Sequence, residues 1–278
     1  VDRKLSSQDA LEKCRQLLDD NAVANFLSER GYKYVHIGSG YGEVRVDSAD
    51  VDLNDTTSNS EYEEEALGLT PLNNATSMEV QKYNEHRSIL NGVFDDLKYV
   101  GSTKGPKFVY AHALAPHPPF VFGDQGEPVN PKGSLTFADG SWLLNNISRE
   151  DYIRGYTNQL KYINTKILDA VKRIISSSKK PPIIIVQGDH GSRMNMDWDY
   201  LERTDVREVF GILNAYYVPD YLRKDLYDSI TPINSFRVIL HDIFGAKLTK
   251  LPDRSYYSTS SEPVNFKDVT DSVSPKKH

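Results

Sequence analysis

Apolar and polar positions along the chain alternate with two distinct periods. Four stretches carry apolar side chains at helical spacing: residues 7–29, 78–97, 150–178 and 232–244. Four shorter, mostly apolar runs read as strands: residues 32–37, 107–114, 183–186 and 210–218. This order of helices and strands predicts an α/β fold, with a mostly parallel central sheet sandwiched by helices, in one domain over residues 1–278.

The most informative run is residues 183–186, four branched aliphatic residues preceded by two prolines and followed by Gly188. It predicts a strand that is buried on both faces. Asp189 and His190 follow at its carboxyl end, where open α/β sheets bind their ligands. A carboxylate beside an imidazole suits Zn²⁺, Mn²⁺ or a similar divalent ion. The simpler alternative is a turn aspartate next to a solvent-facing histidine.

A second histidine follows the predicted strand over residues 107–114. Three prolines surround His117 and fix the local backbone, so its ring is held in a preset direction. An incidental histidine in a proline-rich turn is the alternative. His112 lies five residues before His117, and Arg193 lies three residues after His190. If both strands end at the same edge of the sheet, these groups form a cluster suited to transfer or hydrolysis of an oxyanion ester.

Net charge, apolar run length and cysteine content bear on the classes of function that remain. The 278 residues carry a formal net charge of −6, which argues against nucleic-acid binding. No apolar run is long enough to span a membrane. The single cysteine, Cys14, lies in the first predicted helix and is expected to pack in the core.

Two polar stretches are expected to lie outside the core. Residues 45–77 are predicted to form an exposed acidic excursion, and residues 260–278 a disordered tail. Within the excursion, Asp50, Asp52 and Asp55 are either a cation site or, more simply, part of a solvated loop.

The segments "FVYAHALAPHPPFVF" and "PPIIIVQGDHGSR" together resemble the sulfatase-like branch of the alkaline phosphatase superfamily. The resemblance covers roughly residues 10–258. It implies a hydrolase or transferase of sulfate or phosphate esters with a divalent metal ion (Zn, Mn, Ca or Mg). The branch is similar to phosphoethanolamine and glycerol-phosphate transferases of the cell envelope, which implies an extracytoplasmic or membrane-tethered parent protein.

The resemblance also implies roles for single residues. Asp189 and His190 match late metal ligands, and His117 matches a histidine that faces the phosphate or sulfate. His112 and Arg193 lie within the motifs. His112 is equally well explained as a core histidine with a backbone partner, and Arg193 as a surface residue paired with a nearby carboxylate.

The chain departs from the family pattern at its start. In the family, an earlier strand delivers an acidic metal ligand and a later turn delivers a Thr, Ser or formylglycine nucleophile. Cys14 lacks the Cys-x-Pro-x-Arg setting, and Thr56, Thr57 and Thr231 lack a strand-turn-helix setting. We therefore expect a C-terminal portion of the fold, with weak or absent metal binding and negligible catalysis in this chain.

Lost strands would leave an unpaired sheet edge, through which the chain is expected to form a homo-oligomer. Two other interpretations remain open. One is a non-catalytic scaffold that binds an anionic glycan or a protein partner. The other is a relative of phosphoglycerate mutases or nucleotide pyrophosphatases, which would need further His and Asp ligands.

Overall fold

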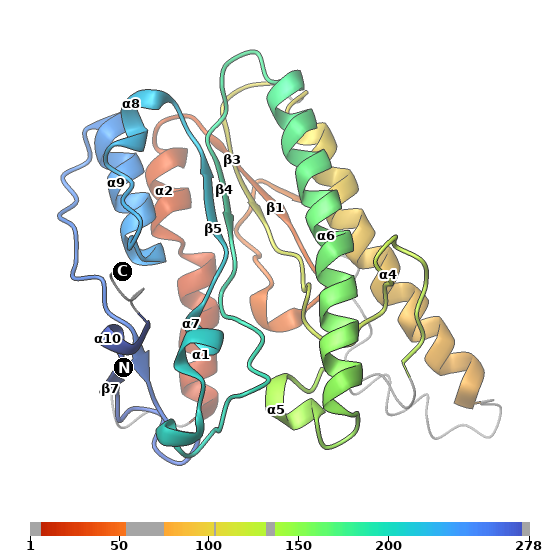
Figure 1. The fold of residues 1–278 in the computed structure, drawn as a ribbon. Helices are drawn as coiled ribbons and strands as arrows, with labels where there is room; N and C mark the ends of the chain where they lie inside the picture. The colour runs from red at the N-terminus through yellow and green to blue at the C-terminus, as the bar shows by residue number, and fades with distance from the viewer. Residues whose placement is uncertain (1–6, 54–74, 103, 132–136, 274–278) are drawn as a thin grey trace. The chain divides into compact units, whose positions relative to one another are not determined.

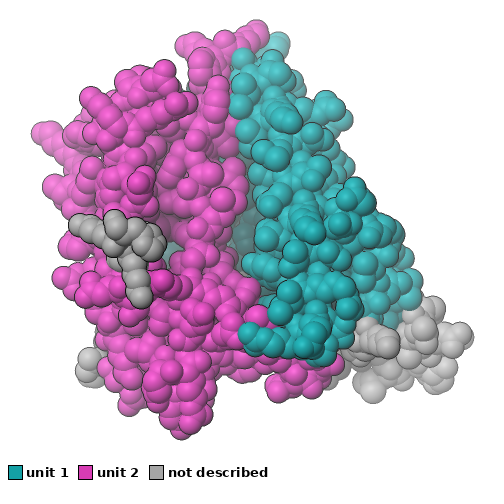
Figure 2. All heavy atoms as spheres, viewed as in Figure 1, with its two compact units in different colours: residues 1–138, 148–178 teal, residues 139–147, 179–278 magenta. Residues whose placement is uncertain are grey.

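The computed structural model describes residues 7–53, 75–102, 104–131 and 137–273. Contacts divide the chain into two compact units, coloured separately in Figure 2. Unit 1 comprises Val1–Ala138 and Ser148–Ser178, and unit 2 comprises Asp139–Ile147 and Lys179–His278. Each unit is described by itself below, and the single domain expected from the sequence stays a prediction.

Unit 1 is built on a three-stranded parallel sheet (Figure 1). Strand β1 (Lys33–Ile37) lies between β2 (Val51–Leu53) and β3 (Lys107–Ala111) and runs parallel to both. Its residues from Tyr34 onward are buried. A parallel sheet flanked by helices confirms the predicted α/β class.

Strand β2 corrects the prediction for residues 45–77, because part of that excursion belongs to the sheet. Val35 of β1 pairs with Val51 of β2. The remainder of the excursion, residues 54–74, lies outside the described residues.

The long helix predicted over residues 7–29 is two helices, α1 (Ser7–Asp19) and α2 (Ala22–Ser28). Asn21 causes the break, because its side-chain oxygen accepts hydrogen bonds from the N–H groups of Val23 and Ala24 and caps α2. Cys14 on α1 is exposed, so the prediction that it packs in the core is wrong.

Two longer helices, α4 (Ala75–Val100) and α6 (Arg149–Ser177), pack against each other in unit 1. Ser148 caps α6 by accepting a hydrogen bond from the N–H of Asp151. Buried residues of α4 pack in two clusters, one with Ile37 of the sheet and one with the loop that follows β3. Helix α4 therefore holds both the sheet and this loop in place.

Unit 2 contains β4 (Ile184–Gln187) and β5 (Asn214–Tyr217), which pair antiparallel. The prediction that the strand over residues 183–186 is buried on both faces is wrong, because the apolar residues of β4 are half-buried. The strand predicted over residues 210–218 is shorter, because Asp205 caps α7 (Val206–Phe210) and draws Phe210 into a helix.

The other elements of unit 2 follow β5. Helix α8 (Asp220–Arg223) precedes α9 (Pro232–Phe244), which begins with Pro232 and ends at Gly245 as predicted. Gly245 adopts a left-handed conformation with φ of 66°. Short 3₁₀ turns lie at Gly42–Val44 (η1) in unit 1 and at Leu201–Arg203 (η2) in unit 2.

The predicted disorder of residues 260–278 is wrong for the described part of that segment. Strand β6 (Tyr256–Tyr257) pairs antiparallel with β7 (Lys267–Asp268), and α10 (Thr270–Val273) follows. Asp268 forms an ion pair with Arg254 at 2.6 Å, and Val269 is buried. These contacts order the segment as far as residue 273; residues 274–278 lie outside the described residues.

None of the helices in the described part of the chain is both long and apolar enough to cross a membrane.

Candidate active site

The residues proposed from the sequence fall into two groups, one in each unit. His112 and His117 belong to unit 1, whereas Asp189, His190 and Arg193 belong to unit 2. Each group is described within its own unit, and the expectation that they share one site stays a prediction.

The half-buried His117 ring is held in one tautomer. Its Nδ1 lies 2.5 Å from the carbonyl oxygen of Pro118. A carbonyl only accepts hydrogen bonds, so Nδ1 carries a proton and the neutral ring has a lone pair on Nε2. Nε2 makes no hydrogen bond with any residue that the structure describes. It can therefore accept a proton or, once the ring is protonated, donate a hydrogen bond to an oxyanion.

The turn that carries His117 is fixed from α6 by Gln159, which is fully buried. The Gln159 side-chain nitrogen donates to the carbonyl oxygen of His117 at 3.0 Å, and its side-chain oxygen accepts the N–H of Val121 at 2.8 Å. One residue thus satisfies a backbone group at each end of the turn, a buried N–H at Val121 and a partly buried carbonyl at His117. The turn also packs closely against α6 at Gly155, where an added Cβ would lie 2.4 Å from Cδ2 of Phe120.

A second buried polar residue, Arg87 of α4, holds the segment that follows. Its guanidinium donates to the carbonyl oxygens of Val121 and Val129 at 3.3 and 2.8 Å, and to the side-chain oxygens of Asn84 and Asn130. These four acceptors are neutral, so among the described residues the positive charge of Arg87 is stabilised by dipoles.

His86, also on α4, lies close to this group. Its Nε2 is buried and has no hydrogen-bond partner among the residues that the structure describes. Burial, with smaller contributions from the charges of His117 and Arg87, lowers the pKa of His86 to about 4. Its ring meets Phe137 edge-on at 5.7 Å, and the His117 ring lies 6.4 Å from the same phenyl group. His86 is therefore neutral at pH 7, beside a histidine whose Nε2 is available.

His112 has a side-chain partner that the sequence did not suggest. Its Nδ1 lies 2.7 Å from Oγ of Ser39, which is 4% exposed. Ser39 follows β1 and His112 follows β3, so the two meet at the carboxyl ends of neighbouring parallel strands.

Two of the three aspartates considered as a cation site interact with the sheet. Asp50 accepts the backbone N–H of Tyr34 at 2.7 Å. Asp52 accepts a hydrogen bond from Nδ1 of His36 at 2.8 Å, across the β1–β2 pairing. Asp55 lies outside the described residues. Both described carboxylates therefore have structural roles at the strand edge.

In unit 2, His190 is held in the same tautomer as His117. Its Nδ1 donates to the carbonyl oxygen of Gly191 at 2.7 Å, which leaves the lone pair of the neutral ring on Nε2. Nε2 lies 3.5 Å from a carboxylate oxygen of Asp189 and 3.8 Å from one of Asp139. The Asp189 side chain is 85% exposed.

The chemistry of this pair fits a divalent metal ion, since a backbone carbonyl on Nδ1 is the usual way to orient a ligating Nε2. Within the described ranges, however, no group of three or more His, Cys, Asp or Glu side chains is arranged to hold a metal ion. The residues present therefore offer two of the three or four ligands that such an ion normally takes.

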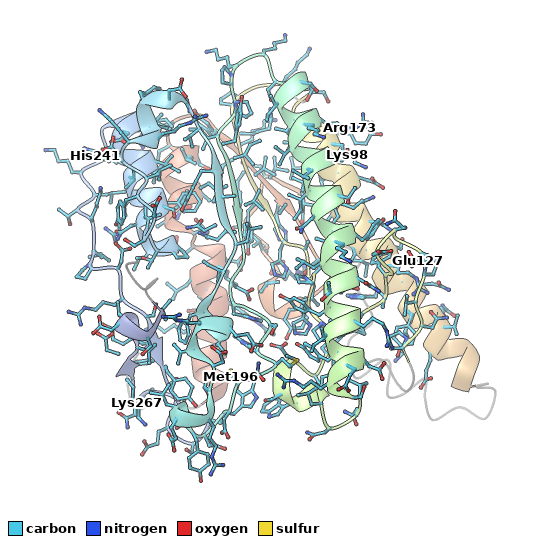
Figure 3. The ribbon with its side chains drawn as sticks, in the orientation of Figure 1. Lys98, Glu127, Arg173, Met196, His241 and Lys267 are labelled. Atoms are coloured by element: carbon cyan, nitrogen blue, oxygen red, sulfur yellow. The ribbon has the colours of Figure 1, made fainter. Side chains whose placement is uncertain are left out.

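Arg193 is built into a rigid turn of unit 2. Its Nη1 lies 3.2 Å from the mostly buried carboxylate of Asp139, and its backbone is left-handed, with φ of 55°. Its carbonyl oxygen accepts the N–H groups of Ser141 and Met196, the latter labelled in Figure 3. With 30% of its side chain exposed, Arg193 has an acidic partner but is not a freely exposed surface residue.

Gly140 and Trp198 complete the surroundings of Arg193. A Cβ on Gly140 would lie 2.3 Å from the Arg193 carbonyl oxygen, so only glycine fits there. The guanidinium carbon of Arg193 lies 5.6 Å from the centre of the Trp198 ring. The buried Nε of Arg193 has no hydrogen-bond partner in the described part of the chain. Asp139 thus links the two motif residues His190 and Arg193.

Comparisons with known proteins agree with the resemblance read from the motifs. A family model described as Sulfatase matches residues 11–234, most of the chain. No similar protein was found among curated proteins, and no similar chain among solved structures. The matched span covers β1, the His117 turn and the Asp189–His190 pair, and the chain belongs to the sulfatase family.

Proposed function

We propose that this chain is the scaffold of a hydrolase or transferase of sulfate or phosphate esters, with His117 facing the oxyanion. Membership of the sulfatase family supports the ester class. The observation that carries the proposal is the fixed tautomer of His117, whose Nδ1 is engaged by Pro118 while Nε2 makes no hydrogen bond with a described residue. Once protonated, Nε2 donates to an ester oxygen or gives its proton to the leaving group.

Asp189 and His190 are the proposed ligands of a divalent ion. Such an ion, when bound, would polarise an oxygen of the ester. The Nδ1 bond to Gly191 presents Nε2 of His190 in its ligating form. Two ligands give weaker binding than three or four, so we propose weak metal binding and little turnover in this chain.

Arg193 is proposed to supply positive charge for an oxyanion in unit 2. Asp139 holds its guanidinium on one side, and Trp198 lies beside it. A guanidinium held in this way loses little side-chain entropy when it binds an anion. Asp139 would in turn keep His190 and Arg193 in a fixed relation.

The proposal includes a localisation and an oligomeric state. An envelope transferase would place the parent protein outside the cytoplasm or tether it to a membrane, and an unpaired sheet edge would favour a homo-oligomer.

The test is a titration of the protein with inorganic sulfate and phosphate, followed by NMR at the histidine side chains. We expect saturable changes at His117, and their loss in His117→Gln. Binding that leaves His117 unchanged would overturn the proposed role. Saturable binding of an anionic glycan without any ester cleavage would favour the non-catalytic scaffold.

A further inference from the structure

A cavity of about 330 Å³ lies within unit 2, along one face of α9. This volume is at the lower end of the range for small-molecule sites. Helix α9 contributes lining residues at helical spacing: Arg237, Val238, His241 (labelled in Figure 3) and Asp242. None of the described residues that line the cavity was proposed for ester chemistry, so the cavity has no role in the proposed function.

The loop that follows α9 is fixed against the helix by two hydrogen bonds. Nη1 of Arg237 donates to the carbonyl oxygen of Thr249 at 2.9 Å, and Nδ1 of His241 donates to that of Ala246 at 2.8 Å. The loop brings Lys250 into the cavity lining. Because the chain itself holds both walls in place, a ligand would bind without a large cost of ordering them.

Opposite charges line this cavity without pairing. Arg237 and Lys250 supply two positive charges, and Asp225 and Asp242 supply two negative charges. None of these four side chains forms an ion pair with a residue that the structure describes. Arg237 and Asp242 lie five positions apart on α9, about 7.5 Å along the helix axis. A small ligand that carries both charges would therefore find a counter-charge at each end.

Asp242 shows which group of a ligand is needed. Its Oδ2 is buried and accepts no hydrogen bond from any described residue. A buried carboxylate oxygen without a donor costs free energy, and an ammonium group is the donor that also balances its charge. Apolar side chains complete the lining, because Val238 is 3% exposed and Leu248 lies on the loop wall.

We propose that this cavity binds a free α-amino acid with an apolar side chain. The ammonium group donates to Asp242, and the carboxylate accepts from Arg237 and Lys250. The apolar side chain contacts Val238 and Leu248. The inference goes beyond the proposed ester chemistry and does not depend on it. Since each charge of the ligand has its own partner, a molecule with only one of the two charges binds less tightly.

The experiment is isothermal titration calorimetry of the 278-residue chain with L-leucine. Three analogues each lack one group: 4-methylpentanoate the ammonium, 3-methylbutylamine the carboxylate, and glycine the apolar side chain. We expect saturable binding of L-leucine and binding at least about 10-fold weaker for each analogue. NMR shift changes at the backbone amides of Val238, Asp242 and Lys250 should locate the ligand.

Two variants test the charges one at a time. Asp242→Asn removes the negative charge with little change in size, and Lys250→Gln removes a positive charge. Each should weaken L-leucine binding by about 10-fold or more. The matched controls are Asp228→Asn and Lys247→Gln, which alter exposed residues outside the cavity lining and should bind like the wild type.

Circular dichroism of each variant separates loss of fold from loss of binding. No saturable binding of L-leucine, or wild-type affinity in both cavity variants, overturns the assignment. Shift changes confined to residues outside the cavity overturn it as well. Affinity for 4-methylpentanoate or 3-methylbutylamine equal to that for L-leucine overturns the recognition of two charges.

Discussion

Gln159 and His117 are joined by a partly buried hydrogen bond of 3.0 Å between the side-chain amide of one and the backbone carbonyl of the other. The same amide accepts the N–H of Val121. The orientation of the candidate catalytic histidine therefore depends on a helix residue 42 positions away in sequence.

Replacing Gln159 by Met should unfold the His117 turn or destabilise unit 1. The substitution leaves the partly buried His117 carbonyl and the buried Val121 N–H without their partner, at a cost of about 2–4 kcal/mol in the free energy of unfolding. Gln159→Glu should cost at least as much at neutral pH, because its buried carboxylate still accepts from Val121 but cannot donate to the His117 carbonyl oxygen. Urea unfolding measures both, and the exposed Gln81→Met is the matched control. A loss of stability no larger than that of the control would contradict the role of the two Gln159 hydrogen bonds.

His86 should make stability depend on pH. Its pKa is lowered from 6.5 to about 4 in the folded protein, so the unfolded chain binds the proton more readily. Above pH 6.5 His86 is neutral in both the folded and the unfolded chain. As the pH drops from 6.5 toward 4, protonation of the unfolded chain lowers the free energy of unfolding by about 3 kcal/mol in total. Urea unfolding between pH 7 and 4 should show a smaller decline for His86→Leu than for the wild type. Equal declines would show that His86 titrates normally.

Gly140 should tolerate alanine far less well than Gly105 does. Both have positive φ, 53° and 86°, so both substitutions incur a backbone strain of about 1–2 kcal/mol. At Gly140 the new Cβ would also meet the Arg193 carbonyl oxygen, which two N–H groups hold in place, whereas nothing lies within 4 Å at Gly105. We expect Gly140→Ala to cost at least about 1–3 kcal/mol more. Equal losses of stability would mean that the Arg193 backbone moves away from a Cβ at position 140 at little cost in free energy.

His190→Ala should abolish metal binding and leave the fold intact. Mn²⁺ should bind weakly to the wild type and broaden the NMR signals around Asp189 and His190, because only two ligands are available. Asp189→Asn should reduce the broadening as well. A stoichiometric metal ion that survives dialysis would contradict the two-ligand account.

Local sequence signals predicted the elements whose ends are marked by caps. Thr231-Pro232 and Gly245 bound α9 in the sequence as in the structure, and Ser148 begins α6. The break between α1 and α2 at Asn21 was not predicted, because the apolar residues keep a helical spacing across the Asn21 cap. Strand β2 was missed because its three residues gain their order from pairing with β1, which no local pattern records.

The candidate site shows the same division. His117 and His190 stand in motifs, so their importance could be read from sequence. Gln159 could not, because a glutamine in an amphipathic helix is usually exposed, and only the packed turn reveals its burial. Asp139 and Ser39 likewise acquire partners only through tertiary contacts, with Arg193 and His112 respectively.

The central claim is that His117 receives an ester oxyanion, and its protonation offers the most direct measurement. Nδ1 already donates to Pro118, so an oxyanion can bind only to an Nε2 that has gained a proton. The measurement is an NMR titration of ¹⁵N-labelled protein with sulfate at neutral pH, read at the two His117 ring nitrogens. The account predicts saturable binding with protonation of Nε2 and tighter binding at lower pH. Sulfate binding that leaves Nε2 unprotonated, or no binding at His117, would contradict it.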